Sequence, residues 1–168
     1  MILSAFTFVH VAISVIGILS GLVVVLGMIS GKRLDGWTRL FLTTTVLTSV
    51  TGFLFPFKGV TPGDVVGVIS LAVLMLAIRA RYRRQLAGGW RRAYVISAVI
   101  ALYFNVFVLV VQLFEKVPAL TALAPKQNEP PFVATQVGVM ATFIVLGILA
   151  ARNFREEAVS VHTQTRAA

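Results

Sequence analysis

Long uncharged segments alternate with short polar ones along this chain, and their lengths predict membrane-spanning helices. Residues 1–31, 40–57, 65–78, 93–114 and 130–151 contain no Lys, Arg, Asp or Glu. Because a helix rises 1.5 Å per residue, about 20 apolar residues cross the hydrocarbon core of a bilayer. The first, fourth and fifth segments satisfy this length easily, and the second nearly does.

The third uncharged segment is short until its flanking residues are considered. Thr61 can cap a helix that has Pro62 at its first position and the carboxylate of Asp64 in its first turn. This helix can continue past Arg79 to about Tyr82, because arginine heads extend to the interface while their stems stay in apolar surroundings. The sequence therefore predicts an all-α integral membrane bundle (1–151) of five transmembrane helices, at about 3–29, 38–57, 62–82, 93–114 and 131–151, followed by a polar tail (152–168).

The distribution of positive charge predicts the orientation of this bundle. Cytoplasmic segments of membrane proteins are enriched in Lys and Arg. With five spans and an outer N-terminus, twelve of the 15 Lys and Arg residues fall on the cytoplasmic side. The outer side receives Lys58, Lys116 and Lys126. We therefore predict that the N-terminus lies outside and the C-terminus lies in the cytoplasm.

Composition agrees with a membrane protein and excludes several kinds of chemistry. Hydrophobic residues make up 58% of the chain and charged residues 12%, against about 25% charged in soluble domains. The net charge of +9 would suggest nucleic acid in a soluble protein, but orientation in the membrane accounts for it, and we expect no nucleic-acid partner. The chain has no cysteine, which excludes disulfides, thiolate metal sites and cysteine nucleophiles. No motif identifies a reaction.

Two pairs of glycines are candidates for close helix contact. Gly17 and Gly21 are four residues apart, as are Gly27 and Gly31. Small residues at this spacing lie on one helix face and let two helix backbones approach closely in a membrane. We therefore expect both pairs to lie at helix–helix contacts.

Four polar side chains within the predicted spans are candidates for binding a ligand or cofactor, whose identity the sequence leaves open. His10, Gln112 and Gln136 have a similar predicted depth near the outer end, so they could converge on one outer-leaflet pocket. Asn105 lies near the middle of its span, where an unpaired amide is costly. The alternative, which we favour, is that each group bonds a neighbouring helix, with about 0.6 kcal/mol per contact.

Two segments outside the spans stand out. Six arginines surround the predicted inner turn, and we expect them to contact anionic lipid headgroups, at about 1 kcal/mol each. They are Arg79, Arg81, Arg83, Arg84, Arg91 and Arg92. The outer loop 115–131 contains four prolines and is longer than most loops between packed helices. It could be a docking surface or a stiff connector.

The stretches LTSVTGFLFPF (47–57) and NVFVLVVQLFEKVPALTALAP (105–125) resemble segments of small bacterial multi-span proteins that are catalogued only as hypothetical. The resemblance extends over most of the chain. It implies a location in the bacterial inner (plasma) membrane, and it implies no activity and no site residues.

Three functions remain open. The glycine pairs, the missing catalytic motifs and the proline-rich loop favour a non-enzymatic accessory, assembly or stabilising subunit of a larger inner-membrane complex, with other membrane subunits or a second copy as partners. A quinone- or haem-binding redox subunit would use His10, Gln112 and Asn105. A small homo-oligomeric transporter or channel would be lined by the threonine face of the second span, which includes Thr48.

Overall fold

The computed structural model describes residues 2–55 and 62–154, and within these ranges every regular element is a helix. The elements are α1 (Ile2–Ile29), α2 (Asp35–Gly52), α3 (Pro62–Ile78), the π-helical turn η1 (Arg79–Arg83), α4 (Gly89–Lys116), α5 (Pro118–Leu123) and α6 (Pro130–Asn153). The prediction of an all-α fold is confirmed. Of the predicted tail 152–168, residues 155–168 lie outside the described ranges.

Several helices are long and apolar enough to cross a membrane, which indicates an integral membrane protein. Among the described residues they are Ser4–Ile29, Gly63–Arg83, Gly89–Lys116 and Pro130–Asn153. The predicted second span, 38–57, corresponds to α2, which already ends at Gly52. Helix α2 is not among the four because its first turn carries Asp35 and its second half is rich in threonine. The end of that predicted span, residues 56 and 57, lies outside the described ranges.

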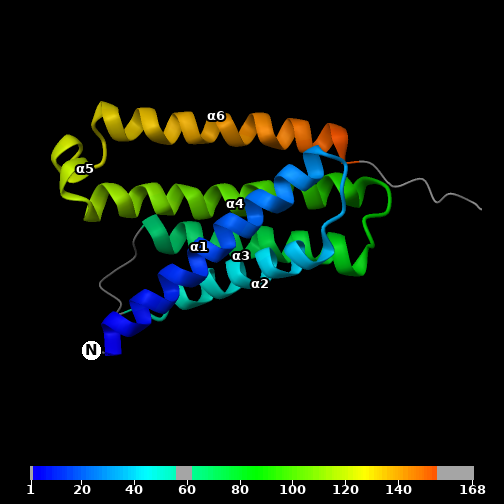
Figure 1. Ribbon diagram of the computed structural model, residues 1–168, viewed down its shortest axis with the longest axis horizontal. Coiled ribbons are helices and arrows are strands. Elements are labelled where there is room, and N and C mark those ends of the chain that lie inside the picture. The colour runs from blue at the N-terminus through cyan, green and yellow to red at the C-terminus, as the bar shows by residue number, and fades with distance from the viewer. Residues whose placement is uncertain (1, 56–61, 155–168) are drawn as a thin grey trace, which may run out of the picture.

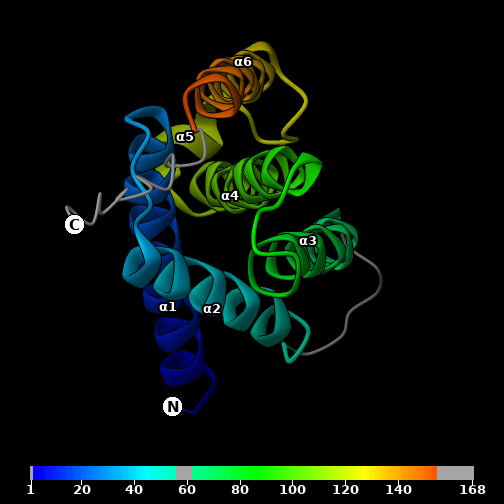
Figure 2. The ribbon, with the colours of Figure 1, turned by 90° about the vertical axis from the view of Figure 1, so that its right-hand side faces the viewer.

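The long helices run between the same two ends of the molecule (Figure 1), with α4 in the centre of the bundle (Figure 2). Helix α4 contacts α1, α3 and α6, and α2 packs along α1. Helix α6 lies on the opposite side of α4 from α3 (Figure 2) and contacts α4 and α1. The short α5 joins the C-terminal end of α4 to the N-terminal end of α6 (Figure 1). The bundle is therefore a core of α1 to α4 with α6 at its edge.

The closest packing in the bundle is where α1 crosses α2 and α4. A Cβ atom at Gly21 would lie 2.6 Å from Leu102 Cδ1 and 2.8 Å from the ring of Phe41. At Gly17 it would lie 3.2 Å from Thr44 Oγ1 and 3.4 Å from Thr45 Oγ1. Only a residue without a side chain fits at Gly21 unless the neighbours move. This glycine pair therefore packs helices of one chain together.

The second glycine pair has a different role from the predicted helix contact, because it ends helix α1. Gly31 adopts a φ of +70°, and its N–H donates to the carbonyl of Met28 over 3.0 Å. The N–H of Lys32 donates to the carbonyl of Gly27 over 2.8 Å. This pair of bonds is the Schellman motif, in which glycine supplies the left-handed conformation. A Cβ at Gly27 would meet Leu34 of the following loop at 2.6 Å, rather than another helix.

Helix α3 ends where the spacing of its backbone hydrogen bonds changes from four residues to five. The last turn of α3 passes into η1, where the N–H of Arg84 donates to the carbonyl of Arg79 over 3.0 Å, five residues back. The extra residue in this wider turn changes the direction in which the next side chains point. Leu86 then folds back into the core, 4% exposed, and its N–H donates to the carbonyl of Ala80 over 3.1 Å.

Candidate functional site

A polar cluster lies where α2, η1 and α4 meet, at the end of the bundle at which α1 finishes. The Arg81 side chain is 3% exposed and its Nη2 forms an ion pair with Asp35 Oδ1. Its guanidinium carbon lies 5.1 Å from the centre of the Tyr94 ring, a cation–π distance. The Tyr94 hydroxyl donates to Thr38 Oγ1 over 3.4 Å. One buried arginine therefore links three elements of the core.

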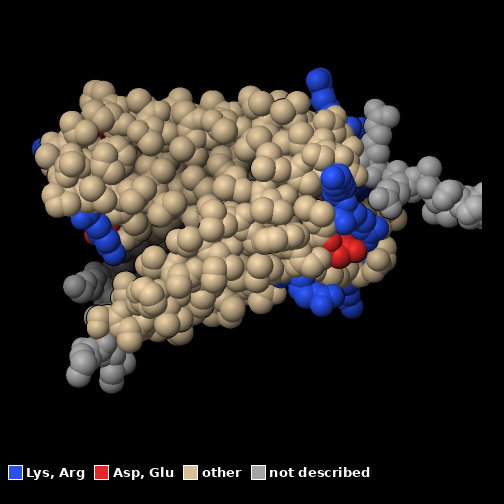
Figure 3. All heavy atoms as spheres, in the orientation of Figure 1, with Lys and Arg blue, Asp and Glu red and all other residues tan. Residues whose placement is uncertain are grey.

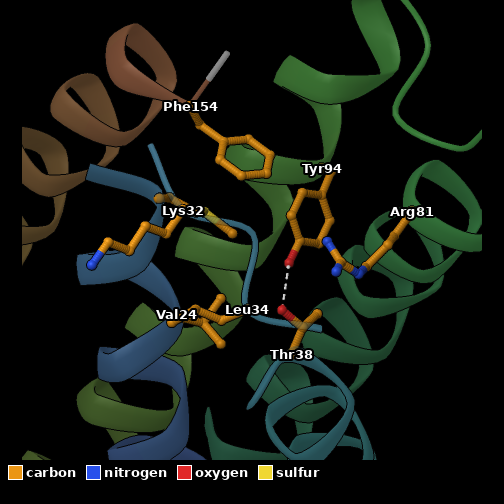
Figure 4. A pocket seen from close by; sticks show the side chains of 8 residues that line it. Val24, Lys32, Leu34, Thr38, Arg81, Tyr94 and Phe154 are labelled. Atoms are coloured by element: carbon orange, nitrogen blue, oxygen red, sulfur yellow. Dashed lines mark hydrogen bonds between the residues drawn. The ribbon is translucent and has the colours of Figure 1, made fainter. Parts of the chain in front are cut away.

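A narrow crevice adjoins this cluster (Figure 4). Its empty volume is about 150 Å³, but no part of it is wide enough for a water molecule. Tyr94 and Arg81 point toward each other at its wall, whereas the amine of Lys32 points away from both (Figure 4). The crevice is a narrow gap between packed side chains. The geometry of the site therefore suits a contact that stabilises the fold more than it suits a binding pocket.

Asn105 lies in the contact between α4, α1 and α2. Its Nδ2 donates to Thr45 Oγ1 over 3.3 Å and lies 3.6 Å from the position of a Cβ at Gly17. The amide in the middle of α4 thus has a hydrogen-bond partner on a neighbouring helix, which removes part of the cost of burying it.

His10 is held between α1 and the end of α2. Its Nδ1 lies 2.8 Å from Thr51 Oγ1, and the Thr51 hydroxyl donates its hydrogen to the carbonyl of Leu47 over 2.6 Å. Because that hydrogen is already used, Thr51 can only accept, so His10 donates from Nδ1. The imidazole also packs edge-on against Phe55, with ring centres 5.2 Å apart. His10 therefore stabilises the contact between the N-terminal half of α1 and the end of α2.

The two glutamines do not join His10. Gln136 is buried between α6 and α4, and its Nε2 donates to the carbonyl of Phe107 over 3.2 Å. Gln112 Nε2 lies 3.4 Å from the Glu115 carboxylate on its own helix. The three candidates for a shared outer pocket therefore have separate partners, Gln112 on its own helix and the other two on neighbouring helices, and the structure does not bring them together.

The six arginines between positions 79 and 92 do not share one environment. Arg81 was expected at the headgroups, but the wider turn of η1 directs it into the core, where it contacts Asp35. Arg79, Arg83, Arg84 and Arg92 are exposed and Arg91 is partly buried. Figure 3 shows that Lys and Arg gather at this end of the molecule, around a single visible acidic group.

The chemistry available to the described residues is limited. No group of three or more His, Asp or Glu side chains among them is placed to hold a metal ion. His10, Asn105 and Gln136 instead contact neighbouring helices, and Gln112 contacts Glu115 of its own helix. No protein-family model, no curated protein and no solved structure matches this chain.

The residue that sequence reasoning missed is Asp35, the carboxylate partner of Arg81. Tyr94, which contacts Arg81 and Thr38, was not among the candidate residues either. A signal was present, since an acidic residue among many arginines at one end of a bundle is a natural counter-charge. The sequence could not show which of the arginines it would meet, because that depends on the π-helical turn.

Proposed function

We propose that this chain is a five-span protein of the bacterial inner membrane, with its N-terminus outside and its C-terminus in the cytoplasm. In this proposal it is a non-enzymatic accessory, assembly or stabilising subunit of a larger membrane complex. The topology and the role are supported by different observations.

Support for a fifth span comes from the course of α2. This helix returns from the end where α1 finishes to the end where α1 begins (Figure 1). Its 18 residues extend about 27 Å, close to the roughly 30 Å of a hydrocarbon core. Its threonines are tolerable in lipid because their hydroxyls bond the helix backbone, as Thr44 does to the Leu40 carbonyl at 2.7 Å.

The observation that carries the accessory role is the open surface of α6. In this 24-residue helix the buried residues are Gln136, Phe143 and Ala150. Small residues lie on its exposed side, among them Ala134, Gly138 and Thr142, and a Cβ at Gly138 would have nothing within 4 Å. Transmembrane helices associate through such small-residue surfaces. The equivalent surface at Gly17 and Gly21 is already occupied by the chain's own helices.

The two other functions receive less support from the geometry. A quinone or haem site would gather His10 with Gln112, which have separate partners. A pathway along the threonine face of α2 would run where Thr44 lies against Gly17 and Thr51 contacts His10, and opening it would separate helices that are in contact.

The orientation is tested with single cysteines, since the natural chain has none to interfere. Arg33→Cys and Leu54→Cys lie before and after α2, and Gln127→Cys lies in the outer loop. A membrane-impermeant maleimide added to intact cells is expected to label positions 54 and 127 and to spare position 33. Equal labelling of positions 33 and 54 would show that α2 does not cross.

The accessory role is tested by the native mass of the tagged full-length protein in a mild detergent, with identification of stoichiometric partners. We expect a complex with other membrane subunits that Gly138→Leu disrupts. Ala72→Leu is the matched control, because it places the same side chain on an exposed position of α3. A monomer or a homo-oligomer in the wild-type protein would contradict the proposal, as would a complex that both variants weaken equally.

A further inference from the structure

Among the described residues, the inner end of the bundle has many more positive than negative charges. Its described cations are Lys32, Arg33, Arg39, Arg79, Arg81, Arg83, Arg84, Arg91, Arg92 and Arg152. Asp35 is the described carboxylate at this end, and it is engaged by buried Arg81 and, at 3.6 Å, by Arg33. The remaining cations at this end have no ion pair with any described residue and attract anions from outside the chain.

The turn between η1 and α4 holds part of this charge in a defined shape. Three of its residues adopt left-handed conformations, with φ of 50° at Gln85, 61° at Leu86 and 54° at Gly88. Two of these are not glycine, so the conformation is unfavourable unless contacts hold it. The burial of Leu86 and its bond to the Ala80 carbonyl provide those contacts. The backbone of this turn is therefore held in one conformation, and it positions the arginines on either side of the turn.

Two arginines at this turn have partly organised side chains. The guanidinium carbon of Arg84 lies 5.0 Å from the centre of the Trp90 ring, so the indole orients it. The Nε of Arg91 is buried and has no hydrogen-bond acceptor, although the residue as a whole is only partly buried. A buried charged donor without an acceptor is costly. The Nε itself is closed to an external anion, but an anion held by the other nitrogens of this guanidinium would offset the cost of its charge.

We propose that this turn binds the phosphate headgroup of an anionic phospholipid, with Arg84 and Arg91 contacting the phosphate oxygens and Trp90 lying beside the glycerol region. Arginine is suited to this role because its N–H groups match the oxygens of a phosphate. The turn directly follows a helix that is apolar enough to cross the membrane, so it lies at the depth of the headgroups. Tryptophan prefers the same depth.

The test uses the full-length protein in phosphatidylcholine nanodiscs that contain increasing fractions of phosphatidylglycerol, with bound lipid counted by native mass spectrometry. We expect Arg84→Gln and Arg91→Gln each to weaken phosphatidylglycerol retention about tenfold, because each variant loses a hydrogen bond from a charged guanidinium to the bound phosphate. Arg79→Gln and Arg83→Gln are matched controls, because they remove the same charge from exposed positions in η1. We expect these controls to change retention less than twofold.

Each other outcome overturns the proposal. Equal weakening by all four variants would mean diffuse attraction to the whole basic end. Displacement of the lipid by inorganic phosphate at the same concentration would mean a site for a soluble anion. If a glutamine variant unfolds, Arg84→Lys and Arg91→Lys replace it. They keep the charge but lose the planar guanidinium, so retention equal to the wild-type protein would show that no oriented site exists.

Discussion

The core formed by α1 to α4 and the peripheral helix α6 are both apolar helical structure, but they are held in place differently. In the core, hydrogen bonds connect one helix to another, as from Asn105 to Thr45 and from Tyr94 to Thr38. The missing side chain at Gly21 leaves room for Phe41 of α2 and Leu102 of α4. Helix α6 is also bonded to the core, from Gln136 to the Phe107 carbonyl and from Asn153 to the Ile29 carbonyl, but it leaves most of its surface uncovered. The difference shows that high hydropathy makes a helix suitable for the membrane. Small and polar residues at the contacts decide which of these helices pack tightly.

Gly21→Leu is expected to have the largest effect on this comparison. The new side chain would overlap Leu102 and Phe41, whose atoms lie 2.6 and 2.8 Å from the added Cβ. Overpacking of this kind destabilises by about 3 kcal/mol. Thermal unfolding in detergent, followed by circular dichroism, measures the loss. An unchanged unfolding midpoint would show that α1 can move away from α2 and α4 at little cost.

Asp35→Asn is expected to have the next largest effect, since it leaves the charge of buried Arg81 without its partner. Loss of one partner of a fully buried pair costs roughly 3–5 kcal/mol, but the Asp35 side chain is 69% exposed. We therefore expect a loss of about 1.5 kcal/mol. The double variant with Arg81→Met should recover stability relative to Asp35→Asn alone. If it is less stable than either single variant, the two residues act independently.

The contact between Asn105 and Thr45 should contribute less. A double-mutant cycle with Asn105→Ala and Thr45→Ala is expected to give a coupling free energy of about 0.6 kcal/mol, typical of hydrogen bonds between membrane helices. Unfolding of the four proteins in a denaturing detergent provides the measurement. A coupling energy of zero would mean that the 3.3 Å contact adds nothing to the packing around it.

Gly138→Leu on α6 should have the smallest effect on the isolated chain, within about 0.5 kcal/mol. A Cβ at this position meets nothing within 4 Å, so the larger side chain has room. The same unfolding measurement compares it directly with Gly21→Leu, which makes the identical replacement in the core. A similar loss at both positions would remove the distinction between core and edge.

The helical architecture could be predicted because it depends on features local to the chain. Uncharged segments of sufficient length form helices wherever lipid surrounds them, since the backbone must satisfy its own hydrogen bonds there. The helix that starts at Pro62 was predicted from its first turn. Helix α2 was less predictable, because Asp35 and its threonines make it the least apolar of the long helices.

The candidate sites were less predictable, because depth along a helix is encoded locally and rotation about its axis is not. His10, Gln112 and Gln136 share a depth in the sequence pattern, yet they face different neighbours. Gly27 and Gly31 have the spacing of a helix contact, yet Gly31 lies beyond the end of α1 and serves its termination.

The sequence by itself determined the all-helical fold, the apolar helices that suit a membrane and the concentration of arginine near the turn before α4. These follow from residue type and order, because lipid solvates apolar side chains and the helix satisfies its own backbone. Only the tertiary structure decided that Arg81 turns inward to Asp35, that Gly21 lies against Leu102 and Phe41 and that α6 lies at the edge. Those outcomes depend on how each helix is rotated against its neighbours, and packing sets that rotation only when all the helices are present.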